Sequence, residues 1–556
     1  MDYEFPTDFD IVIVGTGIIE SIISAAASRV GKRVLHVDEK EYYGGHWASF
    51  SLEAILELKK SKEYPVANVE NPDLCLFGNQ TYDLKNVDYK FHVIPKENTQ
   101  LEKQEDSENQ EKIQLEKQED SENQEQVTEC KDNDENEQVI EKEKPDTDVW
   151  DKGALLKLSR KFNIDLTPKL QYARGHFVEL LISSNIARYS EYRSVSRILT
   201  WYNKKLDFLP CSRSDVFANS KVSVVEKRML MKVLTALNSV DKLNEYENKT
   251  FKQYLTDQKL TPNLIHYLLY GISMSSDDTP CDVGVVNVKR FLDSLGRFGH
   301  TPFLYSMYGS GEIPQAFCRL SAVFGGVFAL GQNIQGFTVS DNKFKSITVR
   351  SQNIQAEHLV MSIEKVPKQF LKSNTQQYIS RCVLITDKSI LDSEKEHLTL
   401  AFYPPENGKP FVKIIELGCL TGTCLKPLYL VHLLAKQGTT PQEDFSSVID
   451  SLFGQNEETN MENENEQKPS ILWSMYFSLP DTNDGDLTEG LPENVFVCPG
   501  PDTDLDYDYS VKKAEEMFRQ IYPDLDFLPR APDPEEIVIG EEEGQEETAE
   551  GDAASP

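Results

Sequence analysis

The distribution of hydrophobic and polar residues predicts a chain that opens with a βαβ unit. Two short runs, Ile11–Val14 and Arg33–Val37, have the composition of buried parallel strands. Between them, small and apolar residues from Ser21 to Val30 predict a helix, and Gly15 and Gly17 supply the tight turn that starts it. The beginning of the chain therefore predicts a Rossmann-like α/β unit.

Short apolar runs separated by turns predict many more strands after Gly296. The predicted strands cover residues 303–308, 325–330, 334–339, 344–349, 359–362, 383–386, 398–403, 412–416, 471–477 and 495–498. A closing helix near Val511–Ile521 follows the last of them. Earlier, Phe177–Ile182 predicts an amphipathic helix, and Ile198–Tyr202 with Leu206–Pro210 predicts a hairpin. The expected fold class is therefore a multi-sheet α/β (α+β) domain of Rossmann type.

Residues 212–295 differ, because their apolar positions fall at helical spacing. One stripe and the leucines beside it comprise Val225, Met229, Val233, Ala236, Val240, Leu230, Leu234 and Leu237. Thr261-Pro262 has the form of a helix N-cap followed by proline, and a further helix is predicted over Val286–Leu295. Two interpretations of these wide faces stay open. They form either the core of a small all-α domain or a cleft between helices that opens to hold an acyl or prenyl chain.

Acidic residues are concentrated in two segments of the 556-residue chain, whose net charge is −33. Residues 97–148 hold 20 acidic and 6 basic residues and contain one sequence twice, at Leu101–Glu111 and Leu115–Glu125. Residues 533–556 hold 10 acidic residues and no basic one. The first segment has no aromatic residue and cannot bury enough apolar area to offset the entropy lost on folding.

These patterns together predict the domain organisation. We expect a sheet domain made of residues 1–95, 149–211 and 296–530, with an inserted helical domain at 212–295. An acidic disordered insertion is expected at 96–148 and an acidic disordered tail at 531–556.

The composition also argues against several functional classes. The acidic balance leaves no basic stripe that could bind nucleic acid. The nine cysteines show neither C-x-x-C spacing nor paired histidines, which argues against a metal site and favours a reducing compartment. Because the chain has no run of 18 apolar residues and no apolar leader, we expect a cytoplasmic protein whose membrane contact is peripheral. No G-x-S-x-G elbow or other catalytic constellation is present.

The glycine-rich turn departs from the dinucleotide-binding pattern at one position. Gly15-Thr16-Gly17 is followed by Glu20, where the third glycine of G-x-G-x-x-G would stand. A carboxylate is a poor neighbour for a pyrophosphate, although Asp38 ends the second strand as in dinucleotide-binding units. One interpretation is a flavin-dependent oxidoreductase with bound FAD or NAD. We favour the other, a scaffold that binds no cofactor.

Three blocks of residues resemble one protein family. The blocks are Asp10–Ser51, Arg160–Tyr189 and Gly296–Arg319. Together they are similar to the superfamily of Rab GDP-dissociation inhibitors and Rab escort proteins, whose fold is that of FAD-dependent monooxygenases without the flavin. The segments that favour the escort branch are Pro210–Phe217, Glu226–Lys232, Lys259–Leu264 and the acidic insertion.

This resemblance implies a non-catalytic role in protein prenylation. An escort protein binds new Rab GTPases in their GDP form and presents them to the αβ heterodimer of Rab geranylgeranyltransferase. It then shields the geranylgeranyl lipid until the Rab reaches a membrane, which implies a cytosolic protein in transient membrane contact. Shielding is needed because each exposed CH₂ group costs about 0.8 kcal/mol. The alternative within the superfamily is a GDP-dissociation inhibitor that extracts and recycles prenylated Rabs.

The resemblance also implies a Rab-binding platform on the sheet domain. It assigns Tyr43 as an aromatic anchor and Glu312, Gln315 and Arg319 to a G-E-x-P-Q-x-x-x-R pattern. If a helix begins near Gln315, Glu312 lies at its N-terminal end and Arg319 follows Gln315 by one turn. Glu312 and Arg319 would then offer opposite charges to Rab. The alternative is a helix N-terminal acid and an ordinary surface charge.

The chain departs from the escort pattern where the transferase contact is expected. Escort proteins carry a phenylalanine on the first long helix of the helical domain and a basic residue soon after. Here the aromatic position falls on Ala236, next to Leu237, and the nearest base is Lys242. Loss of an aromatic anchor can cost about 2 kcal/mol or more of binding energy. Either Leu237 and its neighbours replace the aromatic, or the coupling to the transferase is weaker.

Overall fold

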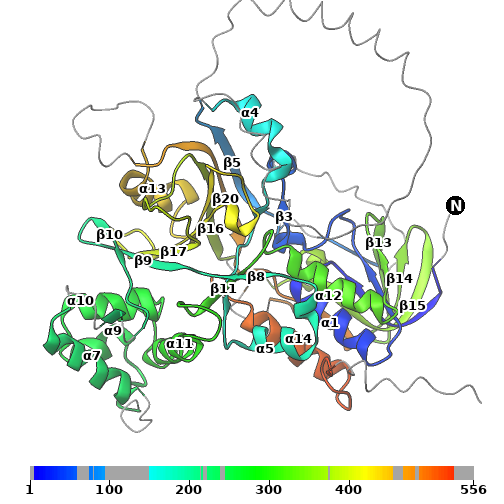
Figure 1. Cartoon of the computed structure of the whole chain (residues 1–556). Coiled ribbons are helices and arrows are strands. Elements are labelled where there is room, and N and C mark those ends of the chain that lie inside the picture. The colour runs from blue at the N-terminus through cyan, green and yellow to red at the C-terminus, as the bar shows by residue number, and fades with distance from the viewer. Residues whose placement is uncertain are drawn as a thin grey trace, which may run out of the picture.

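The computed structural model describes residues 5–58, 74–78, 81–93, 150–212, 215–216, 222–237, 244–372, 376–454, 468–482 and 487–530. The predicted acidic insertion and acidic tail, and also Lys242, lie outside the described residues. Figure 1 shows a sheet-rich body and, at one end of it, a group of helices that includes α7, α9, α10 and α11.

The first large sheet is built around the N-terminal βαβ unit. Its strands follow the order β12-β2-β1-β15-β14-β13-β4, and β21 pairs with β15. They are β1 (Asp8–Val14), β2 (Val34–Val37), β4 (Leu74–Leu76), β12 (Val327–Ala329), β13 (Ile334–Ser340), β14 (Lys343–Val349), β15 (Gln352–Ser362) and β21 (Val495–Cys498). β1 is parallel to both β2 and β15, which confirms the predicted unit.

Three helices pack together against this sheet. α1 (Ile18–Arg29) is buried along nearly its whole length and contacts α12 (Glu312–Val323) and α14 (Asp508–Ile521). The side chains where α1 meets α12 are small, which allows the two helices to pack closely. Ser24 and Ser28 of α1 both hydrogen-bond Ser321 of α12, at 2.9 and 2.8 Å. These hydrogen bonds fix α12 on α1. α14 confirms the predicted closing helix.

The second large sheet has the order β10-β9-β17-β18-β19-β16-β20-β5. Its strands are β5 (Lys85–Phe91), β9 (Arg197–Tyr202), β10 (Lys205–Phe208), β16 (Tyr378–Thr386), β17 (Thr399–Tyr403), β18 (Val412–Leu417), β19 (Tyr429–Lys436) and β20 (Ile471–Pro480). α13 (Pro441–Leu452) packs Phe445 and Val448 against it. The sequence reasoning missed β19, a largely apolar run that His432 interrupts and that has neither strand nor helix periodicity.

Shorter elements join the two sheets. Two small sheets pair β7 (Gln171–Tyr172), β11 (Phe303–Ser306) and β8 (Tyr192–Ser194), and β3 (Ser49–Phe50) with β6 (Ile164–Asp165). The remaining segments include α2 (Leu52–Glu57), α4 (Lys152–Lys157), α5 (His176–Ser183) and the 3₁₀ turns η1 (Gly45–Trp47), η4 (Ser159–Lys161), η5 (Ile186–Arg188) and η10 (Cys419–Thr421).

The helical region contains α7 (Val224–Ala236), α9 (Phe251–Asp257), α10 (Pro262–His266), the π-helical turn η7 (Tyr267–Ile272) and α11 (Cys281–Ser294). Two details of the prediction are wrong. α11 begins at Cys281 rather than Val286, because its first inward residues, Cys281 and Gly284, are too small to form an apolar stripe. On α7 the buried face is centred on Leu230 and Val233, and Val225 is 65% exposed.

Candidate functional site

The loop that leads into α12 is fixed by one buried carboxylate. Asp165, on β6, accepts hydrogen bonds from the Ser49 hydroxyl, the Tyr305 hydroxyl (2.7 Å) and the backbone N–H of Ser310 (2.9 Å). Burial raises the pKa of Asp165, and these donors oppose the rise. The carboxylate therefore ties β3, β6 and β11 to the loop Gly309–Gly311.

Two glycines of this loop are required because neighbouring atoms leave no room for a Cβ at either position. Gly309 has a φ of +109°, and a Cβ there would come within 2.8 Å of an Asp165 oxygen. A Cβ on Gly311 would lie 2.6 Å from the backbone nitrogen of Ser49. The Gly311 N–H instead donates to the Ser49 hydroxyl at 2.9 Å. Glu312 is the next residue, so this packing sets where α12 begins.

Three of the predicted platform residues lie on α12 in the predicted arrangement. The helix begins at Glu312, and Gln315 and Arg319 are both exposed one turn apart. Glu312 is half-buried, and burial raises the pKa of its carboxyl, with a smaller contribution from Asp165. The Arg319 guanidinium lies over the ring of Tyr189, 4.8 Å from its centre.

The fourth predicted residue, Tyr43, lies beside this helix. Its ring meets Phe328 of β12 edge-on, with 6.3 Å between ring centres. Burial raises the pKa of the Tyr43 hydroxyl, and the thiol of Cys318 on α12 adds to the effect. The ring is only half-buried, so part of it is available to a partner. The structure thus brings Tyr43 near α12, although 269 positions or more separate them in the sequence.

Glu20 lies in the space where a dinucleotide would bind, as the sequence indicated. Its carboxylate covers Gly17 so closely that a Cβ there would be 2.5 Å from an Oε atom. Burial raises the pKa of Glu20 to about 8, with Glu364 and Asp38 adding to the rise. The cavity left beside Gly15 and Gly17 has a volume of about 10 Å³, room for roughly one water molecule.

Internal ion pairs line the rest of this cavity. Glu364 pairs with Lys40 at 2.9 Å and with His46 at 3.0 Å. Burial favours a raised pKa for Glu364, but the charges of His46 and Lys40 outweigh it and hold the pKa well below its ordinary value. Asp38, the acid that ends the second strand, accepts a hydrogen bond from the Thr16 hydroxyl at 2.8 Å. The residues present do not fit a flavin or a nicotinamide dinucleotide.

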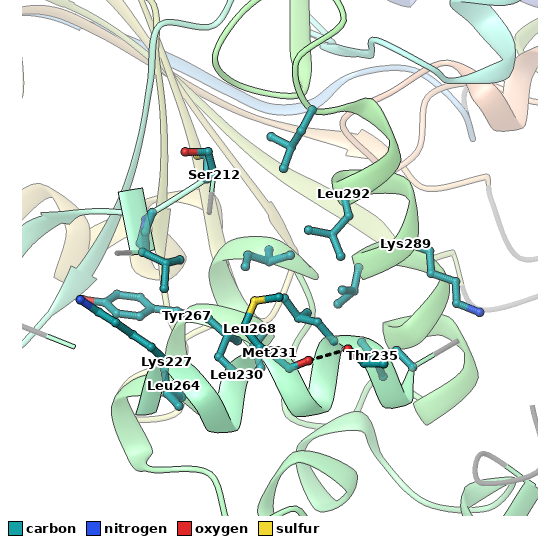
Figure 2. A pocket seen from close by; sticks show the side chains of 18 of the residues that line it. Ser212, Lys227, Leu230, Met231, Thr235, Leu264, Tyr267, Leu268, Lys289 and Leu292 are labelled. Atoms are coloured by element: carbon teal, nitrogen blue, oxygen red, sulfur yellow. Dashed lines mark hydrogen bonds between the residues drawn. The ribbon is translucent and has the colours of Figure 1, made fainter. Parts of the chain in front are cut away.

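The helical region encloses an apolar cavity of about 380 Å³. Its walls come from α7, α10, η7 and α11, together with the segment that follows β10. Figure 2 shows Leu230, Leu268 and Leu292 directed into a common space, with Lys227 and Lys289 at opposite ends of it. The core of this region is therefore not fully packed, which favours the cleft over the closed all-α core.

The predicted transferase residues differ in their surroundings. Leu237 is 1% exposed and lines the apolar cavity, so its side chain packs inside the domain. Ala236, the last residue of α7, is half-buried. Lys242 lies outside the described residues. In this structure Ala236 is thus the member of the pair nearer the surface.

Other chemistry is sparse in the described part of the chain. No group of three or more His, Cys, Asp or Glu side chains there could hold a metal ion. Among the same residues, no helix is both long and apolar enough to span a bilayer. Sequence reasoning gave no role to Asp165, Ser49 or Tyr189, whose only signal was their place inside blocks that resemble the family.

Comparisons with known proteins agree with this geometry. A family model described as GDP dissociation inhibitor matches residues 1–76 and 138–409, and one described as RAE1/2 domain I, C-terminal region, matches 379–503. Rab proteins geranylgeranyltransferase component A 1 of Rattus norvegicus is 36% identical, over 98% of this chain and 95% of that protein. The protein of the same name from Homo sapiens is also 36% identical, over 99% of this chain and 96% of that protein.

Solved structures with low sequence identity share the fold. A Rab GDI from Plasmodium falciparum superimposes with a TM-score of 0.60 at 17% identity, covering 93% of this chain and 99% of that one. An oxidoreductase from Methanosarcina mazei gives a TM-score of 0.52 at 9% identity, covering 92% and 100%. These confirm the expected fold class, a mixed α/β fold shared by GDP dissociation inhibitors and oxidoreductases.

Proposed function

We propose, because this chain belongs to the GDP dissociation inhibitor family and resembles the component A proteins over nearly its whole length, that it is a Rab escort protein. It binds Rab GTPases in their GDP form before prenylation and presents them to the αβ heterodimer of Rab geranylgeranyltransferase. It then keeps the prenylated Rab in the cytosol until delivery, when it contacts the membrane transiently. In this reaction it is an accessory component and not the catalyst.

The outward face of α12 is the single observation that supports Rab binding most directly. Glu312 and Arg319 are seven residues apart, or about 10 Å along the helix axis. Gln315 lies between them on the surface, and Tyr43 flanks the helix. A partner that carries a base and an acid at the same spacing is held in one register. The buried Asp165 fixes the start of the helix before any partner arrives, which lowers the entropy cost of binding.

The apolar cavity supports a role in shielding the lipid. Its volume of about 380 Å³ lies in the 300–1,000 Å³ range of ordinary ligand pockets. Leucines on α7, α10, η7 and α11 form its walls, and each lipid CH₂ that enters gains about 0.8 kcal/mol. We assign the geranylgeranyl chain of the prenylated Rab to this cavity.

The contact with the transferase is proposed for the end of α7. Ala236 takes the position at which an escort protein carries an aromatic anchor, and Leu237 supports it from inside the domain. Lys242, which follows in the sequence, is the proposed basic partner. Because alanine offers far less contact area than phenylalanine, we expect weaker coupling to the heterodimer.

Reconstituted prenylation tests the escort function. The full chain is combined with a GDP-bound Rab, the catalytic heterodimer and geranylgeranyl diphosphate, and lipid transfer to Rab is measured. We expect transfer that depends on the chain. Extraction of prenylated Rab from membranes without any support of transfer would instead identify a GDP-dissociation inhibitor.

Two substitutions test the platform. Glu312→Ala and Arg319→Ala each remove a charge at the centre of the surface, so we expect Rab affinity to fall about 30-fold, or about 2 kcal/mol. Glu443→Ala is the matched control for the acid, because Glu443 is an exposed first-turn acid of another helix, α13. Arg519→Ala, on exposed α14 surface, is the control for the base. Unchanged affinity in both platform variants would overturn the residue assignment.

A further inference from the structure

The exposed face of α12 does not end at Arg319. Val323 follows Arg319 by four residues, which places it on the same face one turn further along. It is 62% exposed, although it is a branched apolar residue. Phe324, which caps the helix, and Tyr189, which follows η5, are also exposed. We name Tyr189, Val323 and Phe324 the α12 end patch.

Two arginines are held against the aromatic rings of the α12 end patch. Arg319 lies over Tyr189, and the Arg29 guanidinium lies over Phe324 at 4.5 Å from the ring centre. Arg29 is also fixed by its Nε, which donates to the carbonyl of Pro529 at 3.2 Å. Burial lowers the pKa of the Arg29 guanidinium, and the nearby Tyr189 opposes this change. The three apolar side chains and the two cations therefore form one surface.

This combination differs from ordinary exposed apolar residues. Single apolar side chains are normal on protein surfaces, but a cluster marks an interaction site. Stacked guanidinium groups have already lost much of their side-chain freedom, so they bind a carboxylate at lower entropy cost. The chemistry fits a partner surface with a protruding apolar side chain and carboxylates beside it.

We infer that the α12 end patch extends the Rab-docking surface, and that its occupant is the folded Rab GTPase. The inference rests on the proposed function, because it commits to the same partner that Glu312 and Arg319 are proposed to bind. Its basis is continuity, since Arg319 belongs both to the platform and, through Tyr189, to the patch. Val323 then adds an apolar contact on α12, where the platform residues Glu312, Gln315 and Arg319 are all polar.

A charge substitution tests the inference with a matched control. Val323→Asp puts a carboxylate on the patch, and we expect the affinity for unprenylated, GDP-bound Rab to fall at least tenfold. Val225→Asp is the control, because Val225 is a valine of similar exposure, 65% against 62%, on α7 of the helical region. It leaves Rab affinity unchanged. Thermal unfolding of both variants checks that each is folded.

The outcomes separate this inference from the proposed function. If Glu312→Ala weakens Rab binding and Val323→Asp does not, the patch is not part of the interface, and the platform stands. If Val225→Asp weakens binding as much as Val323→Asp, the effect is one of charge and the inference fails. If the unmodified chain does not bind Rab at all, the proposed function itself is wrong.

Discussion

Gly311→Ala is the sharpest test of how this fold positions the proposed Rab-binding surface. Gly311 has a φ of −66° and a ψ of −18°, so alanine adopts this backbone without strain. The added methyl group is therefore the whole perturbation. It would lie 2.6 Å from the backbone nitrogen of Ser49 and 2.7 Å from its hydroxyl oxygen.

The cost follows from this contact. An ordinary contact needs nearly 1 Å more, and the backbone atoms of β3 cannot rotate away as a flexible side chain would. Overpacking of this kind costs about 1–3 kcal/mol. The hydrogen bond from the Gly311 N–H to Ser49 is lost as the helix moves. Because Glu312 is the next residue, we expect Rab affinity to fall about tenfold, or about 1.4 kcal/mol.

The assay compares Rab affinity and the thermal midpoint in one set of variants. Gly408→Ala is the control for lost stability without a steric clash, because Gly408, unlike Gly311, has a positive φ, +77°, and lies in the loop between β17 and β18 with no atom near its added Cβ. It costs about 1 kcal/mol of stability and leaves Rab affinity unchanged. If Gly311→Ala loses stability but binds Rab normally, the loop does not position Glu312. If it loses neither, the close packing at Ser49 is wrong.

Three further predictions concern the cavity, the buried Glu20 beside the glycine-rich turn and the two ion pairs of Arg290. Leu292→Asp places a charge on the cavity wall, so extraction of prenylated Rab from membranes should fall at least tenfold while unprenylated Rab binds normally. Folding raises the pKa of Glu20 from 4.5 to about 8, so folding takes up a proton and stability falls as pH rises through that range. Glu20→Gln should remove this fall in urea unfolding curves measured from pH 5 to 8. Arg290→Met leaves Asp506 and Asp508 without their partner, and calorimetry should show a loss of about 2 kcal/mol.

Local patterns predicted the elements whose signal lies within the element itself. The strand Val495–Cys498 was predicted residue for residue, because four consecutive residues with apolar character end at a Pro-Gly-Pro turn. Only the last four residues of β15 were predicted, since its first seven mix buried and exposed positions. The start of α11 was missed for a related reason, because glycine and cysteine are its inward residues.

The residues of the candidate site likewise divide into those with a local signal in the sequence and those that only the fold brings together. The resemblance to the family assigned Glu312, Gln315 and Arg319, and their relative places follow from helical spacing once α12 begins at Glu312. Asp165 and Tyr189 act on that helix from 130 or more positions away, so only the fold brings them there. Leu237 illustrates the limit of reasoning from sequence alone. Its burial against the cavity depends on how α7 is rotated about its own axis.

Thr16 connects the glycine-rich turn to the segment that carries Tyr43, a residue of the proposed Rab-binding platform. Its hydroxyl donates to Asp38 and accepts the backbone N–H of Gly44 at 3.0 Å, so the glycine-rich turn holds the segment that carries Tyr43. A bound dinucleotide would need that same space for its phosphates. The Glu20 carboxylate lies against Gly17 in the interior below the turn. The turn that holds a pyrophosphate in dinucleotide-binding units here holds, through Thr16, the segment next to Tyr43.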